Sequence, residues 1–171
     1  SIQPEGMTYD WVLALLTPIA SALDYLHSEG IVHRDLKPTN IRIDHSESPI
    51  ILDFGIAKDA NDVDSNMTQT GTAMGTQTYM APEQMDAKRV TGAADQYALA
   101  MMAYQMLSGT LPWDASLSSV RVTVAKMTGD LRDLEDADGV SGSLNRMLMR
   151  GLSINPEDRF ENCLEFVLEI E

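Results

Sequence analysis

The segment from Ala93 to Ser108 constrains the fold of this 171-residue chain more than any other segment. It is almost wholly apolar and ends at Gly109, and its large side chains are Tyr97, Leu99, Met101, Met102, Tyr104, Met106 and Leu107. A helix that is apolar all round has to be covered on every side, so the segment predicts a buried central helix. A chain of this length fits one domain built around such a helix, or a large piece of a bigger one.

Four further segments have the pattern of helices that could cover the central one. Apolar residues recur at three- and four-residue steps over Tyr9–Ser28, which is one face of an amphipathic helix. Pro18 lacks a backbone N–H and is expected to kink or split this helix, and Gly30 is expected to end it. The other three helices are predicted over residues 116–127, 141–152 and 160–170.

The rest of the chain predicts little regular structure. Two short apolar runs at residues 41–43 and 50–52 are separated by turn-forming residues, which predicts a small β-hairpin. Residues 59–75 form a long polar loop, and a loop of that length in a compact domain is usually functional or disordered. The acidic residues within 130–138 are expected in a solvated loop. The fold class predicted is therefore mainly α with a small β-hairpin.

Charge and cysteine content exclude several classes of protein. Asp and Glu number 26 against 12 Lys and Arg, and the resulting net charge of -14 disfavours binding to nucleic acid or to an anionic membrane surface. Cys163 is the single cysteine, so no internal disulfide forms and the residue is expected in the core. No apolar run reaches the roughly 18 residues of a membrane span and no secretory leader is evident, so a cytoplasmic location is expected.

Four motifs carry the chemistry, and they occur in a fixed order. They are H-R-D-L-K-P-T-N at 33–40, D-F-G at 53–55, G-T-Q-T-Y-M-A-P-E at 75–83, and finally Asp95 together with Arg159 in N-P-E-D-R-F. Each motif alone is a weak signal, but all of them in this order are highly specific. From about Tyr9 to its C-terminus the chain resembles the eukaryotic-type Ser/Thr protein kinase family, and the sequence around Thr68 and Thr70 is similar to that of the bacterial branch of the family.

The resemblance implies phosphoryl transfer from ATP to Ser or Thr hydroxyls of a protein substrate. Asp35 is then the acceptor of the hydroxyl proton, and Lys37 carries positive charge toward the γ-phosphate. Asn40 and Asp53 are the expected ligands of Mg²⁺, with Mn²⁺ as an alternative, because such cations prefer oxygen ligands. Lys37, Asn40 and Asp53 together form the expected nucleotide-binding set, and a turn or helix cap is the structural alternative for Asp35.

The same resemblance assigns supporting roles to other residues. His33 is expected to pack against Phe54, which precedes Gly55 in D-F-G, and Asp95 to accept hydrogen bonds from the backbone of the H-R-D turn. Glu83 is expected to pair with Arg159.

The resemblance also implies a substrate contact and a mode of regulation. Thr76 corresponds to a threonine that contacts the catalytic Asp and Lys and shapes the pocket for the substrate hydroxyl. Arg34 precedes the catalytic Asp and implies pairing with a phosphorylated residue of the activation segment, residues 53–83. Thr68 and Thr70 match the phosphoacceptor pair and Thr72 is the next candidate, although all three also fit an ordinary polar loop.

A kinase also needs a small lobe with a glycine-rich loop, a strand lysine and a helix glutamate, and these 171 residues contain none of them. Residues 1–171 are therefore expected to be the C-terminal lobe alone, with half an ATP site and little activity by itself. Arg42, where an apolar residue normally lies under adenine, and Ala100, where a glycine is common, depart from the family pattern. Three alternatives stay open: a non-catalytic module that docks a regulatory protein or self-associates through its exposed cleft face, a pseudokinase-like lobe, and a split enzyme whose small lobe is another chain.

Overall fold

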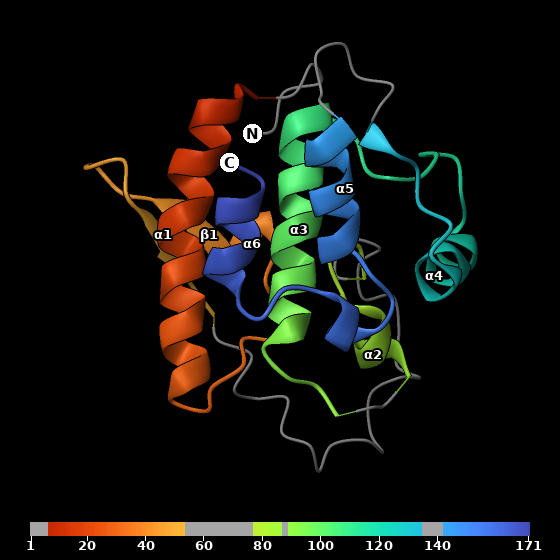
Figure 1. The fold of residues 1–171 in the computed structure, drawn as a ribbon, viewed down its shortest axis with the longest axis horizontal. Helices are drawn as coiled ribbons and strands as arrows, with labels where there is room; N and C mark the ends of the chain where they lie inside the picture. Colours follow the sequence, from red (N-terminus) through yellow and green to blue (C-terminus); the bar gives the residue numbers. More distant parts are fainter. Residues whose placement is uncertain (1–6, 54–76, 87–88, 135–141) are drawn as a thin grey trace.

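A computed structural model describes residues 7–53, 77–86, 89–134 and 142–171 of the chain. The described part is mostly helical and contains one two-stranded antiparallel sheet, which confirms the predicted fold class (Figure 1). The elements follow in the order α1 (Tyr9–Ser28), η1 (Pro38–Asn40), β1 (Ile41–Ile43), β2 (Pro49–Ile51), α2 (Pro82–Met85), α3 (Ala93–Ser108), α4 (Ser119–Thr128), α5 (Gly142–Gly151), η3 (Pro156–Asp158) and α6 (Cys163–Glu169).

Helix α3 is the buried centre of the fold, as its composition predicts. Twelve of its residues, from Ala94 to Met106, are buried, and Gly109 ends it with a φ of 72°. Helices α1 and α6 pack against each other and against α3 on one side, while α5 packs on the other side (Figure 1). The core therefore forms one continuous cluster around α3.

Helix α1 has the predicted bounds, but the expectation that Pro18 splits it is wrong. The helix runs unbroken over 20 residues and buries the face that carries Val12, Leu16 and Ile19. Pro18 lies on the exposed face, where water can hydrogen-bond to the backbone carbonyl that loses its partner.

Ala100 is accommodated by a glycine on the facing helix. A Cβ added to Gly151 in α5 would lie 2.8 Å from Cβ of Ala100 and 3.0 Å from the ring of Phe166 in α6. Gly151 therefore leaves the space that Ala100 fills, and the departure from the family pattern at position 100 carries no sign of strain.

Helix ends differ from the predicted bounds where a polar side chain caps the first turn. Ser118 accepts a hydrogen bond from the backbone of Arg121, so α4 begins at residue 119 rather than 116. Asn162 accepts one from the backbone of Glu165, so α6 begins at residue 163 rather than 160. Both caps hold the residue before the helix in an extended conformation.

The hairpin pairs Ile41 with Ile51 and Ile43 with Pro49, so its second strand begins one residue earlier than predicted. A two-stranded sheet has only edge strands, which tolerate a proline because one side of the strand needs no backbone donor.

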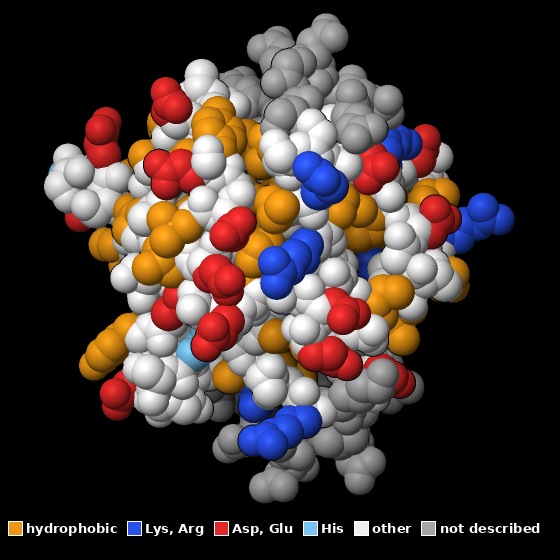
Figure 2. All heavy atoms as spheres, viewed as in Figure 1, with side chains coloured by type: hydrophobic (Ala, Val, Ile, Leu, Met, Phe, Trp, Pro, Cys, Tyr) orange, Lys and Arg blue, Asp and Glu red, His pale blue; other side chains and the backbone are white. Residues whose placement is uncertain are grey.

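Acidic side chains are spread among apolar and uncharged ones over the face seen in Figure 2. Within the described ranges, no helix is both long and apolar enough to cross a membrane.

Candidate active site

Asp35, Lys37 and Asn40 meet in the loop between α1 and the hairpin. Nζ of Lys37 lies 2.7 Å from Oδ2 of Asp35, and both side chains are about one-fifth exposed. Nδ2 of buried Asn40 donates to the backbone carbonyl of Asp35 at 2.8 Å and also lies 3.4 Å from its Oδ2. The short η1 turn, which starts with Pro38, folds Asn40 back toward Asp35.

The turn before Asp35 is held by the carboxylate of Asp95, in the first turn of α3. Oδ2 accepts from the backbone N–H of His33 and Oδ1 from that of Arg34, both at 2.8 Å, so the expected contact is present. Arg34 has a φ of 64°, a strained value for a residue other than glycine. Strain of this kind persists where surrounding contacts fix the backbone, and the buried carboxylate supplies two of them.

Asp53 lies next to this loop because the hairpin closes on it. The backbone N–H of Leu52 donates to the carbonyl of Asn40 at 2.8 Å, and Nε2 of His33 lies 3.0 Å from the carbonyl of Leu52. Asp53 is exposed and has a φ of 53°. Asp53, with its exposed side chain, is therefore the residue directly after Leu52, whose backbone is hydrogen-bonded to Asn40.

The donor atoms available here fit a hard divalent cation. Nδ2 of Asn40 is occupied by Asp35, which leaves Oδ1 of the amide as a potential ligand. Asp53 adds a carboxylate, and Mg²⁺ is bound through one or two carboxylates, other oxygens and water. Asn40 and Asp53 are the two residues that could hold such an ion.

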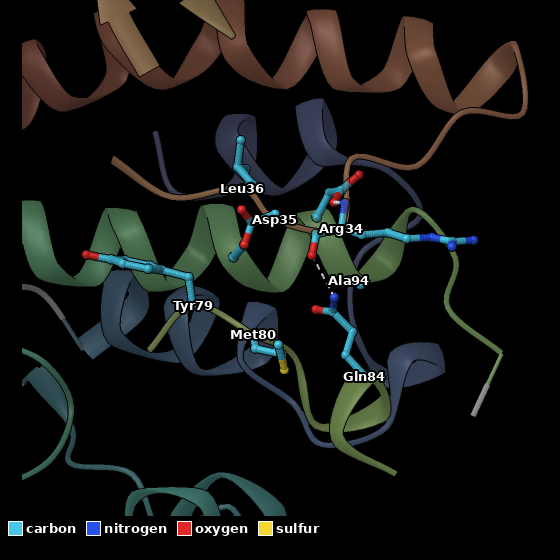
Figure 3. Close-up of a pocket in the computed structure, with 9 residues that line it drawn as sticks. Arg34, Asp35, Leu36, Tyr79, Met80, Gln84 and Ala94 are labelled. Atoms are coloured by element: carbon cyan, nitrogen blue, oxygen red, sulfur yellow. Dashed lines mark hydrogen bonds between the residues drawn. The ribbon is translucent and has the colours of Figure 1, made fainter. Parts of the chain in front are cut away.

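Residues 77–83 lie beside the loop of Asp35 and are tied to it by Gln84. Its Oε1 accepts from the backbone N–H of Ala81 at 2.9 Å, and its Nε2 donates to the carbonyl of Arg34 at 2.8 Å (Figure 3). A small hollow remains between the two segments, lined among others by Asp35, Tyr79 and Met80. The side chain of Arg34 extends away from Tyr79 and Met80 in the same view.

Lys126 of α4 is a functional candidate that the sequence analysis missed. It is 1% exposed, and its Nζ donates to the backbone carbonyls of Gln77, Thr78 and Met80 at 2.9, 2.7 and 2.6 Å. Nζ also lies 5.4 Å from the ring centroid of Tyr97. No motif marks this lysine in the sequence, and its position on the inward side of α4, next to Ala125, is known only from the structure.

Two effects on the protonation of Lys126 oppose each other. Burial lowers the pKa of the amine to about 7. Three carbonyls accept from Nζ, however, whereas a neutral amine has only two hydrogens to donate. The carbonyls and the face of Tyr97 therefore favour the ammonium form up to neutral pH, and burial favours the neutral amine at higher pH.

The ion pair of Glu83 and Arg159 fixes the C-terminal end of residues 77–83. The two N–H···O contacts of this bidentate pair measure 2.7 and 2.8 Å, and both side chains are almost completely buried. Arg159 also donates to the carbonyls of Ala93, Ser153 and Ile154. All donor hydrogens of the guanidinium are thus used, and the pair joins α2 to the segment before α6.

The remaining predicted residues lie outside the described ranges. They are Phe54, Gly55, Thr68, Thr70, Thr72 and Thr76. The packing of His33 against Phe54, the contact of Thr76 with Asp35 and the phosphoacceptor threonines stay predictions.

Comparisons with known proteins agree with this geometry. Residues 4–167 match the family model described as "Protein kinase domain". The chain is 37% identical over 156 residues to a serine/threonine-protein kinase PknH of Mycobacterium bovis and 38% identical over 161 residues to Pkn1 of Myxococcus xanthus, covering 91% of this chain in each case. It spans 26% and 23% of those relatives.

A solved structure has the same fold over nearly the whole chain. The crystal structure of the Mycobacterium tuberculosis PknI kinase domain superposes with a TM-score of 0.71 at 30% identity. The match covers 98% of this chain and 56% of that domain.

Proposed function

Since this chain belongs to the protein kinase domain family, we propose that it carries the catalytic loop of a Ser/Thr protein kinase. The reaction is transfer of the γ-phosphoryl group of ATP to a Ser or Thr hydroxyl of a protein substrate. The observation that carries the proposal is the meeting of a carboxylate, an ammonium group and an amide at Asp35, Lys37 and Asn40 within hydrogen-bond distance. The family generally uses ATP and Mg²⁺.

Phosphoryl transfer needs positioning and charge neutralisation more than covalent chemistry. Asp35 accepts the proton of the attacking hydroxyl and orients it, and its orientation is fixed by Asn40. Lys37 neutralises Asp35 in the absence of substrate and can turn to the γ-phosphate, since its side chain is not fully buried. The two opposite charges thus stay paired until a phosphate competes for the ammonium.

Asn40 and Asp53 would hold Mg²⁺ through the amide Oδ1 and the carboxylate. The ion, when bound, neutralises the phosphate oxygens. The chain's own contribution is to hold these two ligands together by the hydrogen bond between Leu52 and Asn40.

The roles of several other residues rest on the resemblance to the family. We assign Thr76 to the substrate pocket, and Thr68 and Thr70 to phosphorylation sites that pair with Arg34. Residues 1–171 form a C-terminal lobe in this proposal, with residues 53–83 as its activation segment. Clamping of the α- and β-phosphates then depends on a small lobe with a glycine-rich loop, and the isolated 171 residues are expected to be nearly inactive.

The test is a kinase assay on the protein at its full natural length, with radiolabelled ATP, Mg²⁺ and a generic basic protein as substrate. Asp35→Asn should abolish incorporation of the label. Asp44→Asn, in the exposed turn of the hairpin, is the matched control and should leave it unchanged. Equal incorporation by wild type and Asp35→Asn would overturn the proposal, and so would the absence of both labelling and ATP binding in the full-length wild type.

A further inference from the structure

A second group of metal-ligating side chains lies between α1 and α6, apart from Asn40 and Asp53. Asp24 and His27 are three residues apart on α1, and Cys163 is the first residue of α6. One ligand atom from each residue lies within 4.8 Å of the others, and Nδ1 of His27 is 3.9 Å from Oδ1 of Asp24. All three residues line a hollow of about 510 Å³, which also borders Gln96 and Glu161.

The ring of His27 is held in the orientation that a metal ligand needs. Its Nε2 lies 2.8 Å from Oδ2 of Asp95, and since a carboxylate only accepts, Nε2 carries the hydrogen. In the neutral imidazole the lone pair is then on Nδ1, on the side of Asp24. A carboxylate that fixes the second nitrogen of a histidine is the usual outer partner of a metal-bound imidazole.

Gly92 keeps the ring in place without blocking Nδ1. A Cβ added to Gly92 would lie 2.5 to 2.8 Å from three adjacent ring atoms, Nδ1, Cγ and Cε1. Nearly equal distances to three adjacent atoms place the backbone of Gly92 over the face of the ring. The lone pair of Nδ1 lies in the ring plane, so this packing leaves its direction open.

Asp24 is also fixed before any ion binds. Its Oδ1 accepts from the backbone N–H of Cys163 at 2.8 Å and its Oδ2 from that of Leu164 at 2.9 Å. Each carboxylate oxygen has a second lone pair for another partner. These bonds hold the carboxylate against the start of α6, where the Cys163 side chain also begins.

The charges of the cluster call for a cation. His27 has a carboxylate at each ring nitrogen, Asp95 at Nε2 and Asp24 near Nδ1. A divalent ion would balance the negative charge of Asp24 and of a Cys163 thiolate together.

We propose that Asp24, His27 and Cys163 form a binding site for a divalent cation of the zinc class. Sulfur, imidazole and carboxylate ligands select such an ion over Mg²⁺ or Ca²⁺, and water from the hollow completes the tetrahedron. Binding breaks the S–H bond of Cys163, forms the S–metal bond and releases the proton to solvent. The site is joined through Asp95 to the backbone of His33 and Arg34, which form the turn before Asp35.

The test measures metal binding in the absence of ATP and in excess Mg²⁺, which occupies oxygen-rich sites. The untagged chain is stripped with chelator, dialysed against Zn²⁺ and analysed for bound metal, and Co²⁺ serves as the spectroscopic probe. We expect one Zn²⁺ per chain and a near-ultraviolet thiolate-to-cobalt charge-transfer band that Zn²⁺ abolishes.

Variants decide whether these residues are the ligands. Cys163→Ala should remove the cobalt band and weaken Zn²⁺ binding by more than about tenfold, since outer partners alone contribute about 10–100-fold. His45→Ala, in the exposed hairpin turn, is the matched control and should change neither. Should Cys163→Ala fail to fold by circular dichroism, Cys163→Ser replaces it. A wild-type chain that binds no Zn²⁺, or a Cys163 variant that binds it as tightly as wild type, would overturn the proposal.

Discussion

Removal of Arg159 should destabilise the fold more than any surface substitution. The variant is Arg159→Met, which keeps the length of the side chain but removes its charge and its donors. Wild-type Arg159 pairs with both oxygens of Glu83 and donates to three backbone carbonyls. Every one of these acceptors loses a partner in the variant.

The magnitude follows from burial. Glu83 has only 3% of its side chain exposed, so without Arg159 its charge is left in the interior. Breaking a buried pair from one side costs about 3–5 kcal/mol. For a domain of this size, each kcal/mol lowers the melting temperature by roughly 2–4 °C. The expected fall in melting temperature is therefore on the order of 10 °C.

The assay is urea unfolding of the 171-residue chain followed by circular dichroism, with linear extrapolation to water. Arg146→Met is the control, since Arg146 is exposed on α5 and should change the free energy of unfolding by less than about 0.5 kcal/mol. The double variant Glu83→Met/Arg159→Met should lose less than the sum of the single variants, because neither charge is left unpaired. A loss below about 1 kcal/mol in Arg159→Met, or strict additivity in the double variant, would refute this account.

Three further predictions concern α3 and the residues that contact it. Burial lowers the pKa of Lys126 to about 7, whereas an unfolded lysine titrates at about 10.4. Between these two pH values the unfolded chain binds more protons than the folded chain, so the free energy of unfolding should rise with pH. Lys126→Met should lack this rise. If urea titrations at several pH values give the wild type and the variant the same dependence of this free energy on pH, the assignment is contradicted. Gly151→Ala should destabilise the chain by about 1–3 kcal/mol, because the added methyl group overpacks against Ala100. Part of the loss should be recovered when Ala100→Gly is added. An unchanged melting temperature in Gly151→Ala would show that the helices can separate freely. Asp95→Asn should weaken the hydrogen bonds to the backbone before Asp35. It should therefore lower kcat of the full-length protein by a larger factor than it changes KM for ATP. An unchanged kcat would exclude a positioning role for Asp95.

Periodicity and composition predict the helical part of the fold well. The buried α3 and the amphipathic α1 have the predicted bounds because their patterns are long and end at glycines. Errors arise where local chemistry decides: Ser118 and Asn162 delay the starts of α4 and α6 through caps, and Pro18 is tolerated because it faces solvent. The start of a helix depends on whether a polar side chain caps its first turn, and the tolerance of a proline depends on whether its side of the helix faces water.

The candidate site is predictable as far as motifs reach. The residues of the H-R-D segment and the partners Asp95 and Arg159 come from the resemblance. The structure joins Asp95 to the backbone of the H-R-D turn and Arg159 to Glu83, as expected. The expected partners of the side chains of His33 and Arg34 lie outside the described residues. Lys126 has no motif, because its partners are backbone carbonyls that any residues could supply. The cluster of Asp24, His27 and Cys163 joins residues more than 130 positions apart and becomes visible only when α6 is docked on α1.

The docking of α6 by Asp24 has a consequence for how the chain reaches its native state. The hydrogen bond from Cys163 to Asp24 spans 139 residues, so α1 gains this partner only after all the intervening elements have been synthesised. Until then the apolar faces that α1 and α3 turn toward α6 are open to other chains. Contacts between such distant residues slow folding because a long loop must close first. Chaperone dependence during synthesis should therefore centre on these two faces.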